Sequence, residues 1–211
     1  MKLFLFGVTG NAGQAILQEA LSRGHTVTAA ARQTGFFHPV GKASVVTADV
    51  LDTVSFKDTI KGHDAVIVAI SGRKSGHDTV ARAATNLLAT MPEAGVARLL
   101  WVGGAGSLEV APGVRLVDTP QFPAAYNEEA LGQAAALQTL RAGKTSVNWT
   151  YVSPPAMIDV GGRSGKYRVG GDQLLADSTG VSTITWIDFA VAVVDELEKN
   201  AHPQARITVA Y

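Results

Sequence analysis

Three glycines, spaced three residues apart directly after a short apolar run, constrain this chain more than any other feature. The run at residues 2–6, KLFLF, is typical of a buried strand, and Gly7, Gly10 and Gly13 follow it in the stretch GVTGNAG. Glycines between a strand and a helix let the backbone approach a ligand closely, and the unpaired N–H groups that begin the helix attract an anion. The spacing therefore predicts a site for an anionic group such as a diphosphate.

The spacing of these glycines is a variant of a known pattern. The dinucleotide-binding fingerprint is G-x-G-x-x-G, whereas this chain has G-x-x-G-x-x-G. Its position after the first strand, at the start of the first helix of a βαβ unit, favours a dinucleotide site. The alternative is a glycine-rich turn that binds nothing.

The rest of the chain alternates short apolar runs with longer amphipathic segments, which is typical of βαβ units. Several runs are apolar without alternation, so we expect strands buried on both faces, as in a parallel sheet. We expect strands at residues 2–8, 25–32, 44–48, 64–70, 97–103, 146–153 and 205–211, and helices near 12–23, 54–61, 77–91, 126–141 and 187–197. The pattern predicts an α/β fold over residues 1–211: a single domain with a Rossmann-like doubly wound parallel sheet, helices on both faces and a small C-terminal appendage on the substrate side.

Two helix starts and one loop can also be predicted. The segments Ser75–Asp78 and Thr185–Asp188 have capping-box spacing ahead of helical patterns. The glycine-rich stretch at residues 154–172 predicts a loop with a short hairpin.

Composition excludes several classes of function. The 18 basic residues balance the 18 acidic ones, so nothing indicates binding to nucleic acid, and the absence of cysteine excludes thiolate metal sites and cysteine nucleophiles. No apolar run is long enough to span a membrane, and the opening segment is interrupted at Gly7 without a cleavage site, so we expect a soluble, cytoplasmic protein. The histidines lack ligand spacing, and we assign them surface or core roles rather than metal binding: His25, His38, His63, His77 and His202.

The ends of the next strands indicate which dinucleotide binds. The second strand ends at Arg32, nineteen residues after Gly13, where an NAD-binding protein carries an acid for the ribose hydroxyls. Arginine there can instead meet a 2′-phosphate, which favours NADPH while leaving NADH possible. Asp49 and Val50 follow the third strand, near the expected adenine. A surface arginine and a loop aspartate are the alternatives.

The fourth strand ends in Ala69, Ile70 and Ser71, at the carboxyl edge of the predicted sheet. Ligands of open α/β sheets bind at this edge. Arg73 and Lys74 follow and could assist an anionic substrate, although solvated side chains are the simpler interpretation for them and for Lys166.

These residues together resemble the atypical short-chain dehydrogenases, and within them the NmrA-like proteins and NADH-flavin reductases related to biliverdin reductase B. The resemblance covers nearly the whole chain. It is carried by GVTGNAGQAILQEALSRGHTVTAAAR at the N-terminus, ADVLD at 48–52, WVGGAGSL at 101–108, YVSPPAMI with GGRSGKYRVGGD after it, and ITWIDFAVAVVDELE near the C-terminus.

The resemblance implies a role for each part of the site. It places Thr9, Asn11 and Ala12 at the pyrophosphate, Arg32 at the 2′-phosphate, and Asp49 with Val50 at the adenine. It also implies that the nicotinamide ribose and ring are contacted by Ala69, Ile70, Gly104, Ala105, Pro154 and Pro155. The substrate would lie among Ser107, Tyr126 and Met157, although Ser107 could simply cap a loop and Tyr126 could simply begin an amphipathic helix.

One departure from the family bears on the reaction. Short-chain dehydrogenases typically use a Tyr-x-x-x-Lys pair, in which the lysine lowers the tyrosine pKa so that it can donate a proton to a carbonyl. Here Tyr126 is followed by Ala130 at that spacing. Flavin or quinone reduction needs mainly stacking and hydride alignment.

We therefore expect an NADPH-dependent oxidoreductase, monomeric or homodimeric, that reduces a planar acceptor such as a flavin or quinone. The main alternative is an NmrA-type redox sensor that binds the dinucleotide without efficient turnover. A nucleotide-sugar epimerase or reductase is a weaker alternative, because it normally needs the tyrosine–lysine pair and a larger C-terminal domain.

Overall fold

A mostly parallel sheet of eight strands forms the centre of the computed structural model, which describes residues 1–33, 35, 41–73, 76 and 78–211. The strand order is β10-β12-β8-β5-β4-β1-β2-β3, and β10, at one edge, is antiparallel to β12. This order confirms the predicted Rossmann-like, doubly wound fold. The strands are β1 (Lys2–Phe6), β2 (Thr26–Ala31), β3 (Ala43–Thr47), β4 (Ala65–Val68), β5 (Arg98–Val102), β8 (Asn148–Ser153), β10 (Arg168–Gly170) and β12 (Ala205–Ala210).

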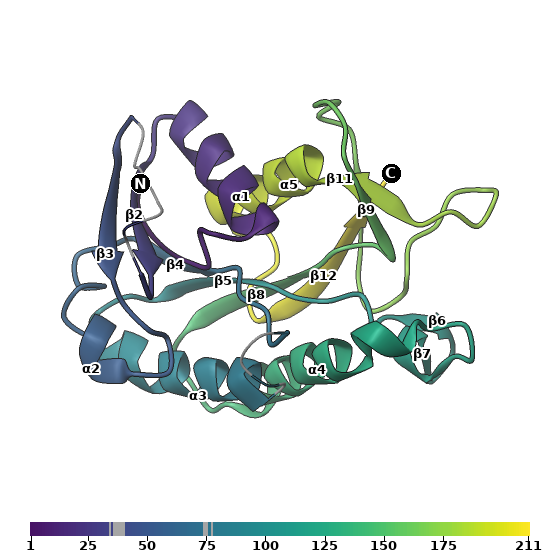
Figure 1. Cartoon of the computed structure of the whole chain (residues 1–211), viewed down its shortest axis with the longest axis horizontal. Coiled ribbons are helices and arrows are strands. Elements are labelled where there is room, and N and C mark those ends of the chain that lie inside the picture. The colour runs from purple at the N-terminus through teal and green to yellow at the C-terminus, as the bar shows by residue number, and fades with distance from the viewer. Residues whose placement is uncertain (34, 36–40, 74–75, 77) are drawn as a thin grey trace.

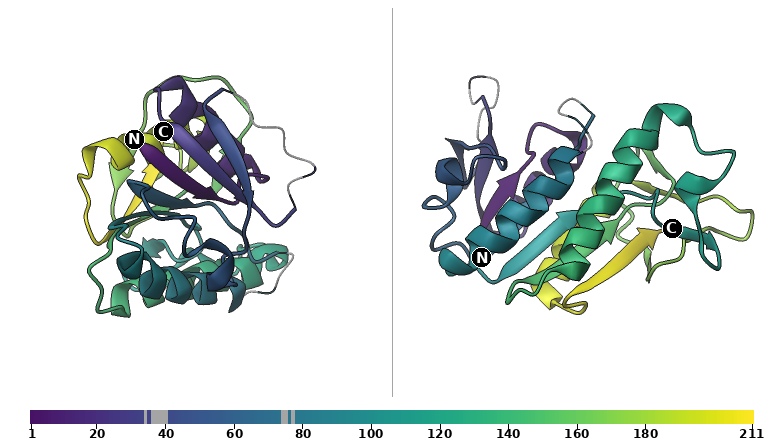
Figure 2. Two further views of the ribbon diagram at one scale, coloured as in Figure 1. Left: turned by 90° about the vertical axis from the view of Figure 1, so that its left-hand side faces the viewer. Right: turned by 90° about the horizontal axis from the view of Figure 1, so that it is seen from below.

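Helices cover both faces of the sheet (Figure 1). One face carries α1 (Asn11–Ser22) and α5 (Trp186–Lys199), and the other carries α3 (Asp78–Glu93) and α4 (Asn127–Ala142), with the short α2 (Thr53–Phe56) beside α3. Figure 2 shows α3 and α4 side by side across the lower face. Short 3₁₀ helices, η1 (Leu116–Asp118) and η2 (Ala124–Tyr126), precede α4.

The first strand shows why the apolar runs lack alternation. Leu3 and Leu5 pack into the core beneath α1 and α5, whereas Phe4 and Phe6 pack into the core against α3 and α4. All four side chains are buried, because successive residues of a strand point to opposite faces and both faces are covered. The prediction of strands buried on both faces is thus confirmed.

Two helix starts can be compared with their predictions. The Thr185 hydroxyl accepts a hydrogen bond from the backbone N–H of Asp188 at 3.2 Å, which confirms Thr185 as the N-cap of α5. The reciprocal bond of a capping box is replaced, because the Thr185 N–H donates to the Tyr211 hydroxyl at 3.2 Å. Ser75, His77 and Lys74 lie outside the described residues. The predicted helix at 54–61 is shorter than expected: α2 ends at Phe56, and the chain continues as hydrogen-bonded turns to Gly62, whose φ of 75° breaks the helical path.

Two small sheets flank the main one, and their strand pairing differs from the hairpin predicted in the glycine-rich stretch. Strands β6 (Glu109–Ala111) and β7 (Val114–Arg115) form a hairpin, and β9 (Met157–Asp159) pairs in parallel with β11 (Thr183–Thr185). The hairpin predicted within residues 154–172 is wrong, because its two strands pair elsewhere: β9 joins β11, and β10 joins the edge of the main sheet.

The buried carboxylate of Asp188 accounts for this arrangement. It accepts hydrogen bonds from the backbone N–H of Gly165 at 2.8 Å, from the Ser164 hydroxyl at 2.6 Å and from the Tyr211 hydroxyl at 2.7 Å. Burial alone would raise the pKa of Asp188, but these hydrogen bonds hold it below its usual value. The stretch is therefore tied to the start of α5 instead of folding back on itself.

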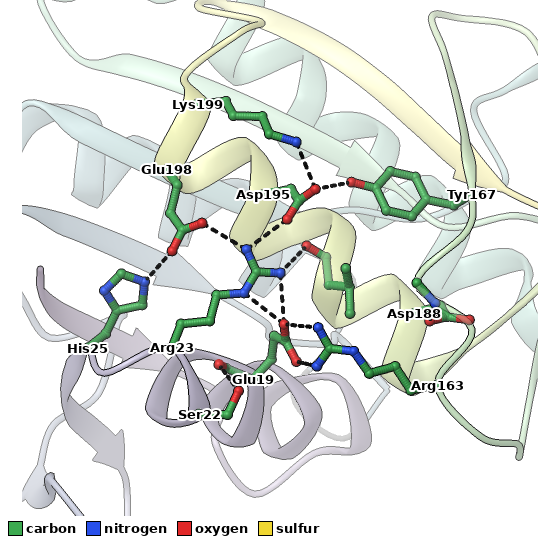
Figure 3. Close-up of polar contacts among 12 residues, drawn as sticks. Glu19, Ser22, Arg23, His25, Arg163, Tyr167, Asp188, Asp195, Glu198 and Lys199 are labelled. Carbon is green, nitrogen blue, oxygen red and sulfur yellow. Dashed lines mark hydrogen bonds and ion pairs between the residues drawn. The ribbon is translucent and has the colours of Figure 1, made fainter.

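A cluster of ion pairs joins α1 to α5 (Figure 3). Arg23 lies within 2.8 Å of three carboxylates, those of Glu19, Asp195 and Glu198. Burial would raise the pKa of Asp195, but hydrogen bonds from Tyr167, Lys199 and Arg23 lower it to about 2. Because the charges alternate in sign, the cluster stabilises the packing of the two helices.

The described histidines have polar partners within the fold. His25 contacts Glu198 at 2.9 Å, His63 contacts the Thr28 hydroxyl at 2.9 Å, and His202 contacts Glu196 at 2.7 Å. His38 and His77 lie outside the described residues. Within the described ranges, no helix has both the length and the apolar character needed to cross a bilayer.

Candidate dinucleotide site

A cavity of about 330 Å³ opens at the carboxyl edge of the sheet. It is bordered by the segments that follow β1, β2, β3 and β4, so it lies where the strand order reverses between β1 and β4. Such a reversal is where ligands bind in doubly wound sheets. Its lining residues are Phe6, Gly7, Thr9, Gly10, Ala30, Ala31, Arg32, Ala48, Asp49, Val50, Leu51, Ala69, Ile70, Ser71, Arg73 and Thr79.

Two of the three glycines are required by close backbone packing. A Cβ on Gly7, whose φ is 86°, would lie 2.1 Å from the carbonyl oxygen of Ala69, and a Cβ on Gly13 would lie 2.2 Å from the carbonyl oxygen of Gly7. Neither position can accept a side chain without backbone movement. These glycines bring β1, β4 and the start of α1 together.

Gly10 has a different environment. A Cβ there would meet nothing closer than the Gly7 carbonyl oxygen at 3.6 Å, and its φ of −89° is open to any residue. It is exposed, lines the cavity and forms the N-cap of α1, where no side chain caps the helix and no acidic residue occupies the first turn. The positive end of α1 is thus open toward the cavity, as a diphosphate requires.

The predicted adenosine residues line the same cavity. Arg32 is exposed just after β2, and no carboxylate in the described part of the chain pairs with it. The Asp49 carboxylate accepts a hydrogen bond from the backbone N–H of Leu51 at 2.9 Å, so it shapes the loop after β3 as well as bordering the cavity. The local and the ligand-binding interpretations of Asp49 are therefore compatible.

The predicted nicotinamide residues lie partly inside this cavity. Ala69, Ile70 and Ser71 line it, whereas Gly104, Ala105, Pro154 and Pro155 lie at the same edge beyond it, after β5 and β8. Asn11 and Ala12 begin α1 next to Gly10, also outside the lining set.

The predicted substrate residues do not share a cavity. Ser107 borders a second cavity of about 390 Å³ beside α4 and the β6–β7 hairpin, where Arg206 donates a hydrogen bond to its carbonyl at 3.3 Å. Tyr126 is 49 % exposed, and the Arg73 guanidinium carbon lies over its ring, 5.0 Å from the ring centre. Met157 is exposed on β9. A joint role for these residues remains a prediction.

Arg73 lines the dinucleotide cavity, and its side chain is 64 % exposed, in keeping with the expected solvated side chain. It follows β4 and forms an ion pair with Glu129 of α4, so it links the end of β4 to that helix. Thr79 and Leu51 also line the cavity, and no motif marks them. Leu51 lies in the turn after β3, so its position relative to that strand could have marked it, whereas Thr79 lies in the first turn of α3, eleven residues after β4 ends.

The position where the dehydrogenase lysine would stand is tightly packed. Ala130 is buried, and a Cβ on Gly106 would lie 2.5 Å from the Ala130 Cβ. The helix therefore approaches the loop after β5 too closely for a longer side chain at residue 130.

Comparisons with known proteins agree with this geometry. The model of a family described as NAD(P)H-binding matches residues 7–200. The uncharacterized protein YwnB of Bacillus subtilis is 38 % identical over 212 aligned residues, which cover 99 % of this chain and 98 % of YwnB.

Two crystal structures are similarly close. A candidate epimerase from Bacteroides thetaiotaomicron has 36 % identity and a TM-score of 0.91, covering 100 % of this chain and 96 % of that one. A candidate NADH-flavin reductase, SP1627 from Streptococcus pneumoniae, has 35 % identity and a TM-score of 0.83, covering 100 % and 99 %. The chain therefore belongs to the NAD(P)H-binding family, within its atypical short-chain dehydrogenase and NmrA-like group.

Proposed function

We propose that this protein is an NADPH-dependent oxidoreductase that reduces a planar acceptor, a flavin or a quinone. The observation that carries the proposal is the shared cavity: the open N-terminus of α1, the exposed Arg32 and the carboxyl end of β4 border one space. These groups match, in order, a diphosphate, a 2′-phosphate and the nicotinamide end of a dinucleotide. NADPH supplies a hydride when bound.

The acceptor class is inferred from what the chain lacks and from its relatives. With Ala130 packed against Gly106, no lysine can stand four residues after Tyr126, so the proton-donating pair of typical dehydrogenases is missing at this position. A flavin or quinone does not need such a donor, because its protons can come from water. The likeness to the candidate NADH-flavin reductase SP1627 supports this acceptor class, but the candidate epimerase is at least as similar, so the missing lysine carries the choice between the two.

The test measures binding and turnover separately. Wild-type protein should bind NADPH in calorimetry and oxidise it when FMN or a quinone is added. Arg32→Gln should weaken NADPH binding about ten- to a hundredfold, with NADH little affected, because one charge-assisted contact is lost. Arg82→Gln, an exposed arginine on α3 outside the cavity lining, serves as the matched control.

Each outcome distinguishes the candidates. No affinity for either coenzyme refutes the proposal outright. Tight binding without turnover across flavins and quinones favours the redox-sensor alternative, and unchanged NADPH affinity in Arg32→Gln refutes the assignment of the 2′-phosphate.

A further inference from the structure

We propose that the backbone carbonyl of Gly103 accepts a hydrogen bond from the carboxamide N–H of the nicotinamide, and that Tyr151 and Gln133 are positioning residues that fix this carbonyl. The inference rests on the proposed function, since it requires a nicotinamide dinucleotide in the cavity. It identifies an anchor for the reactive ring, whereas the glycine motif concerns only the diphosphate.

The Gly103 carbonyl lacks a partner because of the residue opposite it. Strands β5 and β8 are parallel with Val102 opposite Val152, and the Gly103 N–H continues the ladder by donating to the Val152 carbonyl at 2.9 Å. In a parallel ladder, the carbonyl of such a residue accepts from the N–H two residues further along the neighbouring strand. That residue is Pro154, which has no N–H. Across the described ranges, no group donates to the Gly103 carbonyl.

Tyr151 fixes the direction of this carbonyl. The Gly104 N–H donates to the Tyr151 hydroxyl at 3.2 Å, and that hydroxyl donates to the backbone carbonyl of Gln133 at 3.0 Å. The peptide between Gly103 and Gly104 is trans, so its C=O points opposite to its N–H. The carbonyl therefore points away from the buried tyrosine, at the edge where the strands end.

Glycine is required at residue 103 for the same reason. A Cβ there would lie 2.0 Å from Cε1 of the Tyr151 ring, so the ring lies directly against the backbone that it holds. Tyr151 is fully buried, which prevents the ring from moving aside.

Gln133 connects this peptide to the wall of the dinucleotide cavity. Its side-chain amide donates to the Ile70 carbonyl at 3.0 Å and accepts from the Trp101 indole N–H at 3.2 Å. Ile70 lines the cavity, and Trp101 lies on β5 two residues before Gly103. The buried glutamine thus fixes the ends of β4 and β5 relative to each other and to α4.

The chemistry of this acceptor selects its partner. A neutral carbonyl at a half-buried position attracts an N–H or O–H donor and disfavours an anion. At the end far from the adenine, such donors are the hydroxyls of the nicotinamide ribose and the carboxamide N–H groups on the reactive ring, and an analogue without the carboxamide N–H separates the two. A hydrogen bond from the carboxamide orients the ring, since the carboxamide is attached to it directly.

The test compares two dinucleotides that differ only in the carboxamide group of the nicotinamide. Wild-type protein should bind NADP⁺ about tenfold more tightly than its 3-acetylpyridine analogue, which lacks the carboxamide N–H. Tyr151→Phe removes the group that holds the peptide and should bind the two ligands nearly equally. Affinity for 2′,5′-ADP, which lacks the nicotinamide, should be the same in both proteins.

Two further variants separate positioning from general damage to the fold. Tyr167→Phe removes a tyrosine hydroxyl that bonds to Asp195 on the opposite face, and it should retain the wild-type preference. Pro154→Ala restores an N–H opposite Gly103, which can occupy the carbonyl, so the preference should again disappear. This variant keeps the proposal testable if Tyr151→Phe fails to fold.

The inference is overturned if wild-type protein binds both dinucleotides equally, or if Tyr151→Phe and Pro154→Ala retain the preference. These results leave dinucleotide binding intact and so spare the proposed function. Failure of wild-type protein to bind NADP⁺ at all refutes the proposed function and this inference together.

Discussion

Alanine substitutions at Gly10 and Gly13 should differ in what they impair, ligand binding or stability, although both glycines belong to one motif. At Gly10 the new methyl group meets only the Gly7 carbonyl oxygen at 3.6 Å, an ordinary contact, and the backbone angle is permitted. The expected loss of stability is about 0.5–1 kcal/mol, because alanine is a poorer N-cap than glycine. The methyl group does occupy the space in front of the α1 amides.

At Gly13 the same methyl group cannot fit. It would lie 2.2 Å from the Gly7 carbonyl oxygen, so the backbone must move by about 0.8 Å to reach even a tight contact. Overpacking of this kind costs about 1–3 kcal/mol, against a gain of about 1 kcal/mol in helix propensity. We therefore expect Gly13→Ala to lower the free energy of unfolding by up to about 2 kcal/mol, whereas Gly10→Ala acts mainly on ligand binding.

Calorimetry with NADPH and urea unfolding measure the two effects separately. Gly10→Ala should weaken NADPH binding about ten- to a hundredfold, since a lost hydrogen bond to a charged group costs about 1.5–3 kcal/mol. Gly162→Ala, in open space on a distant loop, should change neither quantity. Wild-type affinity for NADPH in a folded Gly10→Ala protein would refute the assignment of this loop to the diphosphate.

Two stability predictions follow from the buried charges. Glu196→Ala leaves the buried guanidinium of Arg98 without its partner at 2.9 Å and should lower the free energy of unfolding in urea by about 3–5 kcal/mol. Glu93→Ala breaks an exposed pair with Lys57 and should lower it by at most about 1 kcal/mol, so equal losses of stability in the two variants would contradict the prediction. Burial would raise the pKa of Asp195, but hydrogen bonds lower it from 3.8 to about 2 in the folded protein. The ionised Asp195 therefore stabilises the fold fully when the pH is above the unfolded-state pKa, and this stabilisation is lost as the pH falls toward the folded-state pKa. Asp195→Asn should remove about 1–2 kcal/mol near neutral pH, after allowance for solvent screening, and should flatten the acid dependence of unfolding; an unchanged acid slope contradicts the assignment.

The adenosine half of the site could be predicted because its signals are local. The glycines directly follow β1, and Arg32 and Asp49 directly follow β2 and β3, so strand order alone brings them to one edge. Periodicity and a turn residue suffice to locate each of them. The structure adds the different reasons for each glycine, which depend on the Ala69 and Gly7 carbonyls across the turn.

The acceptor side could not be predicted in the same way, because its arrangement depends on contacts between residues far apart in the chain. Ser107 follows β5 at the expected edge, but Arg206, ninety-nine residues later, bonds to its carbonyl beside a different cavity. Likewise, the glycine-rich stretch before β10 looks like a hairpin until Asp188 binds its backbone. No spacing rule links either pair.

The contrast between the halves bears on whether the protein is a reductase or a sensor. Binding of the adenosine and diphosphate serves both functions equally, because neither group reacts. Hydride transfer additionally requires a fixed nicotinamide ring, since a small misplacement of the reacting atoms is costly. The buried contacts of Tyr151 and Gln133 with Gly104 and Ile70 fix the backbone where that ring would lie. A redox sensor that distinguishes NADPH from NADP⁺ also needs an ordered nicotinamide end, because the two forms differ only in that ring. Turnover with an added flavin or quinone, and not this network, therefore separates the two functions.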